Sequence, residues 1–330
     1  MRENGREITY RQALQEALRE EMYRDDGVFL MGEDIADPFG SAYKVTLGLS
    51  PIFGTDRVIQ TPISEQGFTG AAVGAAITGL RPVLEYMYID FTTMAMDQLA
   101  NQAAKIRYMS GGQAKVPVVF RTQGGPGRSS AAQHAQSLEA WFHHLPGLLV
   151  AMPSTPHDAK GLLKSAIRDN NPVIFFEHKQ LYEVEGPVPE EDYTIPLGQA
   201  DVKRKGSDVT LVTYSYMVTK SLAAADKLAR DGIDVEVVDL RTVDPIDEDT
   251  ILASIKKTHR LVVVQETWPK CSVSSEIAAI AAEKALDYLD EPVVRVTARE
   301  VPTPFAPVLE EFVLPSEEKI IAAVRQVADG

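Results

Sequence analysis

Short apolar runs alternate with longer helical stretches along most of this chain, and no other feature of the sequence restricts its fold as strongly. The first half contains the runs VFLMG (28–32), RVIQTPI (57–63), RPVLEYMYI (81–89), VPVVFR (116–121), GLLVAMP (147–153) and PVIFFEH (172–178). An amphipathic helix is predicted ahead of them, over residues 9–24, where apolar residues recur at helical spacing. Alternation of this kind is typical of a parallel sheet covered by helices.

The alternation lapses between about residues 182 and 206, where the sequence is rich in Pro, Gly and charge. It resumes with the apolar runs SDVTLVTYS (207–215), DVEVVDLR (234–241), HRLVVVQE (259–266) and PVVRVTA (292–298), and helical segments near 218–230, 247–257, 273–286 and 316–328 separate or follow them. We therefore predict an α/β fold with two domains, over residues 1–190 and 207–330, joined by a linker over 191–206.

The composition narrows the classes of partner. Asp and Glu outnumber Lys and Arg by 47 to 33, which gives a net charge of -14, and no basic run is present that could follow a phosphate backbone. We expect no nucleic acid partner. The single cysteine excludes an internal disulfide, the N-terminal sequence is charged, and no apolar stretch reaches the length of a membrane span. The prediction is a cytoplasmic protein that does not cross a membrane.

The segment TPISEQGFTGAAVGAAITGL (61–80) is the most unusual part of the chain. It predicts a helix that begins at Glu65, with Ser64 as N-cap, and that carries Gly67, Gly70 and Gly74 on one face. Each glycine destabilises a helix by ~1 kcal/mol relative to alanine. Close approach of another helix would offset this cost, and the spacing alone leaves open whether that helix belongs to the same chain or to another subunit.

Glu65 and His134 are the candidate catalytic residues. A carboxylate in the first turn of a helix is electrostatically favoured whether or not it does chemistry, but Glu65 has small and apolar neighbours and so needs a partner, such as a ligand nitrogen. His134 lies in a loop of small residues that follows the run VPVVFR, a common position for catalytic groups, although an isolated loop histidine is more often plain surface. We find neither a nucleotide-binding glycine motif nor the spacing of a zinc site.

Six sequence strings, in order between about residues 8 and 328, together resemble the beta subunits of the pyruvate, acetoin and branched-chain 2-oxo acid dehydrogenase complexes. They are GEDIADPFGSAYKVTLGL, TPISEQGFTGAAVGAAITGLRPV, DQLANQAAKIRYMSGG, AAQHAQSLEAWF, PSTPHDAKGLLKSAIRDNNPV and VPTPFAPVLEEFVLP. Each string alone is weak, but the combination is specific. The resemblance implies a transketolase-like architecture, with an N-terminal pyrimidine-binding domain that contains a parallel sheet and a smaller C-terminal α/β domain.

The resemblance also implies a site for thiamine diphosphate. The family's cofactor-activating glutamate corresponds to Glu65, and its catalytic histidine corresponds to His134. The residues around the aminopyrimidine ring correspond to Glu33, Ile63, Met87 and Phe91, and a structural potassium ion (K+) corresponds to Val118, Ala166, Asp169 and Asn171. A glutamic acid that hydrogen-bonds a ring nitrogen favours the imino tautomer, which then takes the thiazolium C2 proton. His134 would serve the reductive acylation of a lipoyl group.

A motif that the chain lacks bears on its partners. Members of the family hold Mg2+ and the cofactor's diphosphate through a Gly-Asp-Gly motif followed by Asn-Asn, and this chain has Asn170-Asn171 without Gly-Asp-Gly. Because a magnesium diphosphate needs hard oxygen ligands, the resemblance implies an alpha subunit that supplies them in an α2β2 heterotetramer. It also implies a lipoylated dihydrolipoamide acyltransferase core as partner. Pyruvate is the expected substrate, and acetoin and branched-chain 2-oxo acids are the alternatives.

Two other readings of the sequence compete with this one. A truncated transketolase or deoxyxylulose-phosphate synthase would carry the diphosphate-binding half upstream in the same polypeptide, whereas this sequence begins almost directly at the first helix. A non-catalytic α/β binding or electron-transfer subunit would use Glu65 and His134 for structure only. Binding of thiamine diphosphate that depends on Glu65 would separate the catalytic from the non-catalytic reading.

Overall fold

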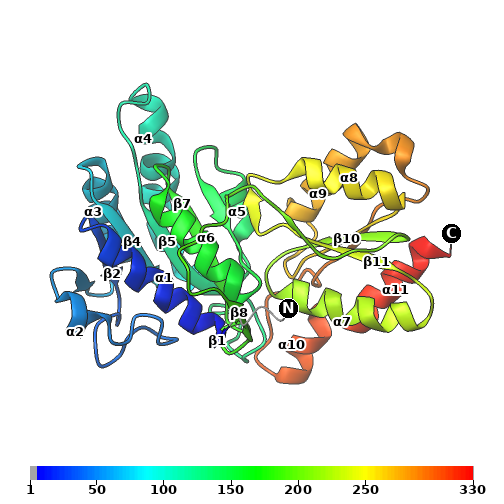
Figure 1. Cartoon of the computed structure of the whole chain (residues 1–330), viewed down its shortest axis with the longest axis horizontal. Coiled ribbons are helices and arrows are strands. Elements are labelled where there is room, and N and C mark those ends of the chain that lie inside the picture. Colours follow the sequence, from blue (N-terminus) through cyan, green and yellow to red (C-terminus); the bar gives the residue numbers. More distant parts are fainter. Residues whose placement is uncertain (1–5, 330) are drawn as a thin grey trace. The chain divides into compact units, whose positions relative to one another are not determined.

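The computed structural model describes residues 6–329 (Figure 1). The chain divides into two compact units, of which the first comprises Met1–Gly124 and Trp141–Leu197 and the second comprises Gly125–Ala140 and Gly198–Gly330. The division near residue 197 falls in the stretch where the sequence pattern lapses. The inclusion of 125–140 in the second unit was not anticipated, because these residues have no apolar period that would assign them to either sheet.

The first unit is built on a parallel sheet in which the strands are ordered β6-β7-β5-β4-β2-β3. Its strands are β2 (Val28–Gly32), β3 (Val58–Gln60), β4 (Arg81–Tyr86), β5 (Val119–Gly124), β6 (Leu149–Ala151) and β7 (Val173–His178). Every residue of β5 and β7 is buried, as expected for strands covered on both faces. A separate antiparallel ribbon pairs β1 (Arg6–Thr9) with β8 (Glu185–Val188).

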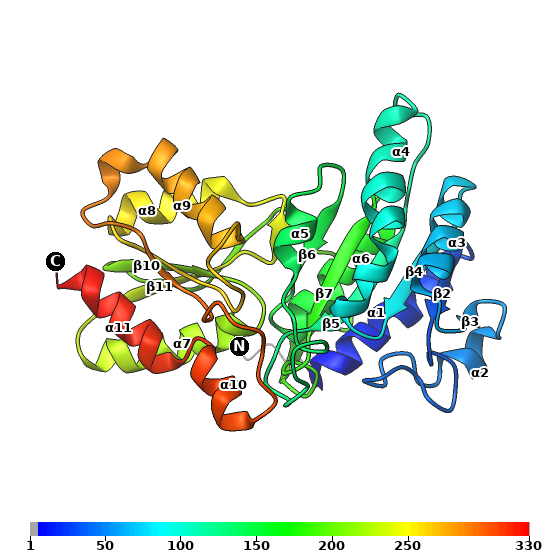
Figure 2. The same cartoon turned by 180° about the vertical axis from the view of Figure 1, so that it is seen from behind.

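Helices α1 (Tyr10–Arg24) and α6 (Pro156–Arg168) pack side by side on the first sheet (Figure 1). Thr9 and Gln12 form a capping box at the start of α1, and Thr155 caps α6. Lys160 of α6 is buried and lies 2.9 Å from Glu20 of α1. The remaining helices of this unit are α2 (Leu49–Phe53), α3 (Glu65–Ile77), the 3-10 helix η1 (Ile89–Ala95), the π-helix η2 (Asp97–Ala103) and α4 (Ala104–Met109). α3 contacts β4, η1 and η2, and Figure 2 shows α3 next to β4.

A buried ion network crosses the middle of the first sheet. Arg121 of β5 is 1% exposed and donates to both carboxylate oxygens of Glu177 on β7, at 2.7 and 2.9 Å. It also donates to Glu85 on β4 at 2.7 Å, and the hydroxyl of Tyr182 donates to Glu177 at 2.7 Å. Because both carboxylates are almost fully buried, their charges depend on this one guanidinium.

The second unit contains a five-stranded sheet ordered β14-β13-β10-β11-β9, in which only β9 is antiparallel to its neighbour. The strands are β9 (Asp201–Arg204), β10 (Val209–Thr213), β11 (Val235–Asp239), β13 (Leu261–Val264) and β14 (Val294–Val296), and a short β12 (Thr242–Asp244) follows β11. The helices are α7 (Tyr216–Arg230), α8 (Glu248–Thr258), α9 (Val273–Lys284), η3 (Leu286–Tyr288), α10 (Pro307–Val313) and α11 (Glu317–Ala328). α5 (Glu139–His143) begins at the end of the 125–140 segment.

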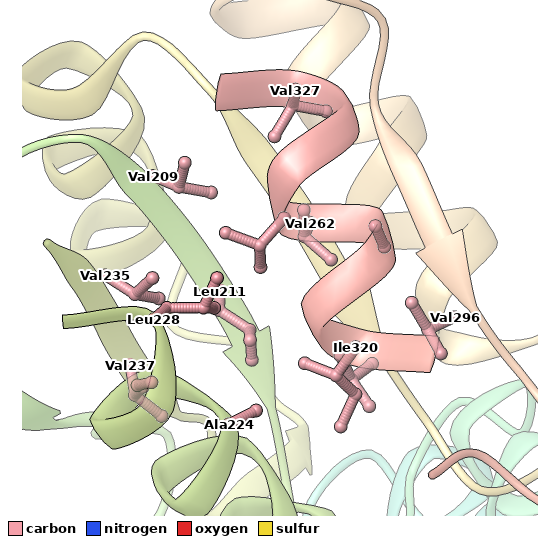
Figure 3. Packing of buried hydrophobic residues seen from close by; sticks show 14 of the residues in the cluster. Val209, Leu211, Ala224, Leu228, Val235, Val237, Val262, Val296, Ile320 and Val327 are labelled. Atoms are coloured by element: carbon pink, nitrogen blue, oxygen red, sulfur yellow. The ribbon is translucent and has the colours of Figure 1, made fainter. Parts of the chain in front are cut away.

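Helices cover both faces of the second sheet, with α8 and α9 on one side and α7 and α11 on the other (Figure 1). The core between the sheet and α7 and α11 is aliphatic, and Val209, Leu211, Val262 and Ile320 within it are completely buried (Figure 3). The α/β class and the parallel first sheet predicted from the sequence are confirmed. Among residues 6–329, no helix is both long and apolar enough to span a membrane.

Most predicted strands are present but shorter than their apolar runs. β3 covers only residues 58–60 of the predicted 57–63, and the chain leaves the sheet before Pro62, which has no N–H to donate to a neighbouring strand. β5 likewise begins at Val119, after Pro117, and extends to Gly124. Residues 201–204, which lie in the predicted linker, form the antiparallel strand β9.

Candidate active site at the carboxyl edge of the first sheet

Four of the predicted cofactor residues follow strands that end at one edge of the first sheet. Glu33 comes directly after β2, Glu65 follows β3 after a short loop, and Met87 comes directly after β4, with Phe91 in the adjoining helix η1. Because β2, β3 and β4 are parallel neighbours, their carboxyl ends open on the same edge. Ligands of open α/β sheets bind at this edge.

Glu65 is the first residue of α3, as the sequence predicts, and it is half-buried. Ser64 occupies the N-cap position but makes no capping hydrogen bond with its side chain. The Ser64 hydroxyl instead lies over Gly67, where a Cβ would come within 2.6 Å of it. The predicted N-cap position is therefore confirmed, but the Ser64 side chain does not accept a hydrogen bond from the free N–H groups of the first turn.

A buried hydroxyl pair ties the first turn of α3 to strand β4. The Thr69 hydroxyl donates to the Glu65 carbonyl and lies 2.6 Å from the Tyr86 hydroxyl. Tyr86 is completely buried, and burial, with a smaller contribution from the charge of Glu65, raises the pKa of its hydroxyl above the ordinary value. Tyr86 thus stays neutral and anchors the helix that presents Glu65. Sequence reasoning missed this contact because neither residue has a distinctive neighbourhood in the chain.

Glu33 is the most strongly perturbed carboxyl of this edge. It is 7% exposed. Burial raises the pKa of Glu33 from 4.5 to about 7, and the negative charge of Glu65 acts in the same direction. A hydrogen bond from the Ser64 backbone N–H lowers the pKa but does not cancel this rise. The Oε1 atom of Glu33 is buried without a hydrogen-bond partner among the residues described. A carboxyl in this state can take a proton or accept a hydrogen bond from a ligand nitrogen near neutral pH.

Apolar and aromatic groups lie beside the two carboxyls in the chain. Met87 is half-buried, and its carbonyl accepts a hydrogen bond from the Gln123 side chain. The Phe91 ring stands edge-on to Tyr88, with 5.9 Å between ring centroids. Ile63 is 82% exposed, which is unusual for an isoleucine in a folded unit. Ile63 precedes Glu65 by two residues, and Met87 and Phe91 follow the carboxyl end of β4.

Among the residues described, one other helix, η2, comes close to the glycine face of α3. A Cβ at Gly70 would meet the Gln98 side chain of η2 at 3.3 Å, whereas a Cβ at Gly74 would have nothing described within 4 Å. The sequence left open whether the close neighbour is in the same chain or another. The structure gives Gly70 a neighbour in the same chain and leaves Gly67 and Gly74 exposed.

His134 belongs to the second unit, in the 125–140 segment, and its side chain is exposed. A backbone hydrogen bond of 3.0 Å from the Gly125 N–H to the Gln136 carbonyl closes the loop that contains it. The expectation that His134 lies in the same active site as Glu65 stays a prediction, since these two residues are in different units.

The residues predicted to bind K+ gather around the end of α6 in the first unit. The Asp169 carboxylate accepts from the backbone N–H and side-chain amide of Asn171, at 2.7 and 2.8 Å. The Asp169 carbonyl accepts from Arg81 at 2.8 Å, and the carbonyl of Val118 accepts from a backbone N–H of β7 at 2.9 Å. Ala166 is in the last turn of α6. Oxygen donors of this kind suit a hard cation.

The described residues contain no cluster of three or more His, Cys, Asp or Glu side chains that could hold a metal.

The chain is similar to known proteins along nearly its whole length. Residues 6–185 match the family described as transketolase, pyrimidine binding domain, and residues 198–320 match transketolase, C-terminal domain. The pyruvate dehydrogenase E1 component subunit beta of Rickettsia felis is 52% identical over 321 residues, which are 97% of this chain and 98% of that protein. The acetoin:2,6-dichlorophenolindophenol oxidoreductase subunit beta of Bacillus subtilis is 47% identical over 334 residues, 98% of each chain.

A solved structure shares the fold. The structure described as split gene transketolase, inactive beta4 tetramer, superimposes with a TM-score of 0.80 over 98% of each chain at 23% sequence identity. This likeness concerns the fold alone. Together with the two domain matches, it confirms the two-domain, transketolase-like α/β architecture that the sequence predicts.

Proposed function

This chain belongs to the transketolase-like family that contains the beta subunits of pyruvate dehydrogenase E1 and acetoin dehydrogenase, and we propose that it is the beta subunit of a pyruvate dehydrogenase (acetyl-transferring). The family depends on thiamine diphosphate. The observation that carries the proposal is the coupled carboxyl pair at the carboxyl edge of the first sheet, where Glu33 has a pKa of about 7 and a buried oxygen without a partner.

Both carboxyls have roles in the proposal. Glu65 would accept or hold the proton at a ring nitrogen of the aminopyrimidine, because α3 begins with Glu65 just after β3, at the edge where ligands bind. The buried Oε1 of Glu33 would accept a hydrogen bond from the same ring. Because the pKa of Glu33 is about 7, its carboxyl would be half-protonated near pH 7 and would exchange protons with its surroundings. When bound, the cofactor supplies an electron sink for decarboxylation. Ile63, Met87 and Phe91 would exclude water from the ring.

The reductive half of the reaction is assigned to His134. An imidazole is a common proton donor and acceptor in catalysis. We propose that His134 donates a proton to one lipoyl sulfur as the S–S bond of the lipoyl group breaks and the other sulfur takes the acyl group, with both electrons supplied by decarboxylation of the 2-oxo acid. The lipoyl group belongs to a dihydrolipoamide acyltransferase. Its exposure and its place in a closed loop support the assignment.

The proposal divides the cofactor between two polypeptides. The sequence has no Gly-Asp-Gly motif, and the described residues hold no acidic or His/Cys cluster for a metal. We therefore propose that an alpha subunit supplies the ligands of Mg2+ and the diphosphate, in an α2β2 heterotetramer. The K+ site at Val118, Ala166, Asp169 and Asn171 is part of the same proposal and would stiffen the end of α6. The cytoplasmic location stays a prediction.

Acetoin dehydrogenase is the second candidate, because a relative at 47% identity is named acetoin:2,6-dichlorophenolindophenol oxidoreductase subunit beta. Branched-chain 2-oxo acid dehydrogenase is a third reading, from the sequence resemblance alone. Turnover of pyruvate, acetoin and 2-oxoisovalerate by the complex purified with its alpha subunit would distinguish the three. We expect pyruvate to give the highest kcat/KM.

The test of the site is Glu65→Gln in the assembled complex. Gln keeps the shape and cannot take up a proton, so we expect decarboxylation to fall by roughly 10²- to 10⁴-fold, the usual contribution of a proton-transfer group. Thiamine diphosphate binding, followed by protein fluorescence, should weaken as well. Glu248→Gln is the matched control, because Glu248 is also the first residue of a helix and is partly exposed. Normal turnover by an assembled Glu65→Gln complex would show that the assignment is wrong.

A further inference from the structure

The loop that carries His134 has an unusual backbone. Gly125, Gly127, Ser129 and Ala131 all have positive φ, at 80°, 99°, 52° and 59°. Glycine adopts this conformation without cost, but Ser129 and Ala131 do so only where surrounding contacts hold them. The shape of this loop therefore depends on whatever binds its backbone.

A buried carboxylate binds that backbone directly. Glu310 of α10 is 4% exposed. Its Oε1 accepts the N–H of Gly127 at 2.8 Å, and its Oε2 accepts the N–H of Ser129 at 3.1 Å. Backbone N–H groups in such a turn form an anion-binding concavity, and here the anion is a side chain of the same unit. Both oxygens are acceptors in charge-assisted hydrogen bonds.

The other end of the loop is held at its base. The Gly125 N–H donates to the Gln136 carbonyl at 3.0 Å. The Thr267 hydroxyl donates to the Ser137 carbonyl, also at 3.0 Å. His134 thus lies between two fixed points, Ser129 on one side and Gln136 on the other.

We propose that Glu310 is a positioning residue for His134, which fixes the loop in the conformation needed for proton transfer to the lipoyl group. The inference rests on the proposed function, in which His134 serves reductive acylation. Glu310 acts on the loop through the backbone N–H groups of Gly127 and Ser129. Loss of its carboxylate should therefore affect the step that uses His134 and leave decarboxylation nearly intact.

The test compares Glu310→Gln with Glu311→Gln in the complex with the alpha subunit. Gln keeps the size of the side chain but turns one acceptor into an NH2 donor that faces a backbone N–H. Glu311 is the adjacent, exposed residue of the same helix. Two activities are measured with pyruvate: acetylation of a free lipoyl domain, and decarboxylation with 2,6-dichlorophenolindophenol as the electron acceptor. Hydrogen exchange of the 125–137 peptide reports the loop itself.

We expect Glu310→Gln to slow lipoyl acetylation by about 10- to 100-fold, within the contribution of one acid–base group, with KM for pyruvate changed by less than about 2-fold. Decarboxylation should stay within about 2-fold of the unmodified complex, and exchange of the Gly127 and Ser129 amides should accelerate by about 10-fold or more. Glu311→Gln should match the unmodified complex in every assay. Equal losses of both activities would instead indicate a structural role and overturn the proposal.

His134→Ala separates this inference from the proposed function. If His134→Ala leaves lipoyl acetylation unchanged, the catalytic role of His134 fails, whatever Glu310 does. If His134→Ala is impaired while Glu310→Gln acetylates at the normal rate, the positioning role of Glu310 alone is wrong. Should Glu310→Gln fail to assemble, Glu310→Asp is measured instead, because it keeps both acceptor oxygens on a side chain that is one methylene shorter. Slower lipoyl acetylation with faster amide exchange of the loop and normal decarboxylation would support the proposal, and equal losses of both activities would overturn it.

Discussion

Replacing Glu33 by Gln should stabilise the cofactor-free chain at pH 8 and change its stability much less at pH 5. The folded protein holds the Glu33 proton with a pKa of about 7, whereas the unfolded chain releases it near 4.5. Between these values the folded state binds more protons than the unfolded state, so the free energy of unfolding falls as the pH rises. The stabilising contribution of the proton is complete below pH 4.5 and is lost as the pH rises toward and through 7.

The size of the effect follows from the same two values. At about 1.4 kcal/mol per pH unit, the difference between 4.5 and 7 corresponds to about 3 kcal/mol. Linkage over the range from pH 5 to pH 8 gives a loss of about 2 to 3 kcal/mol from this one group. Because Glu33 is only 7% exposed, little of this is screened by solvent. Gln has no charge to bury, so the variant should not show the loss.

Urea unfolding followed by circular dichroism at pH 5 and pH 8 measures the effect. Between pH 5 and pH 8 the unmodified chain should lose about 2 to 3 kcal/mol of unfolding free energy that the Glu33→Gln chain does not lose. The difference in stability between the variant and the unmodified chain should therefore increase by that amount. Glu248→Gln, at a partly exposed helix start, should show no such gain and serves as the control. A Glu33→Gln chain whose stability follows the same pH curve as the unmodified chain would refute the reasoning, because Glu33 would then not be held neutral by burial.

Two further predictions concern the framework of the first unit. Arg121→Met should lower the free energy of unfolding by about 3–5 kcal/mol, because it leaves two buried carboxylates without their cation. Urea unfolding at pH 7 measures this loss. A loss of less than about 1 kcal/mol would contradict the assigned ion network. Gly147→Ala should destabilise by about 3 kcal/mol, since the new Cβ would lie 2.0 Å from the Ala104 carbonyl oxygen at a φ of 105°. Gly111→Ala has a positive φ without that clash and should cost only ~1 kcal/mol; equal thermal shifts in the two variants would rule out the clash as the cause.

The sequence alone determined the α/β class, the parallel first sheet and the helix that begins at Glu65. These features follow from local patterns, since apolar runs with a strand's length and a helical period depend only on residues near one another in the chain. Family resemblance supplied Glu33, Met87 and Phe91, and the structure places all three at the edge where Glu65 lies, because parallel strands end together.

Only the tertiary structure decided the contacts that join distant parts of the chain. Tyr86 supports the start of α3 through Thr69, and Glu310 binds a loop more than 180 residues earlier in the sequence. It also decided that the 125–140 segment belongs with the second unit. No pattern in the sequence encodes these pairings, because a hydrogen bond between remote residues forms only where the fold brings the two segments together. Burial and the pKa of Glu33 likewise depend on what surrounds it in space.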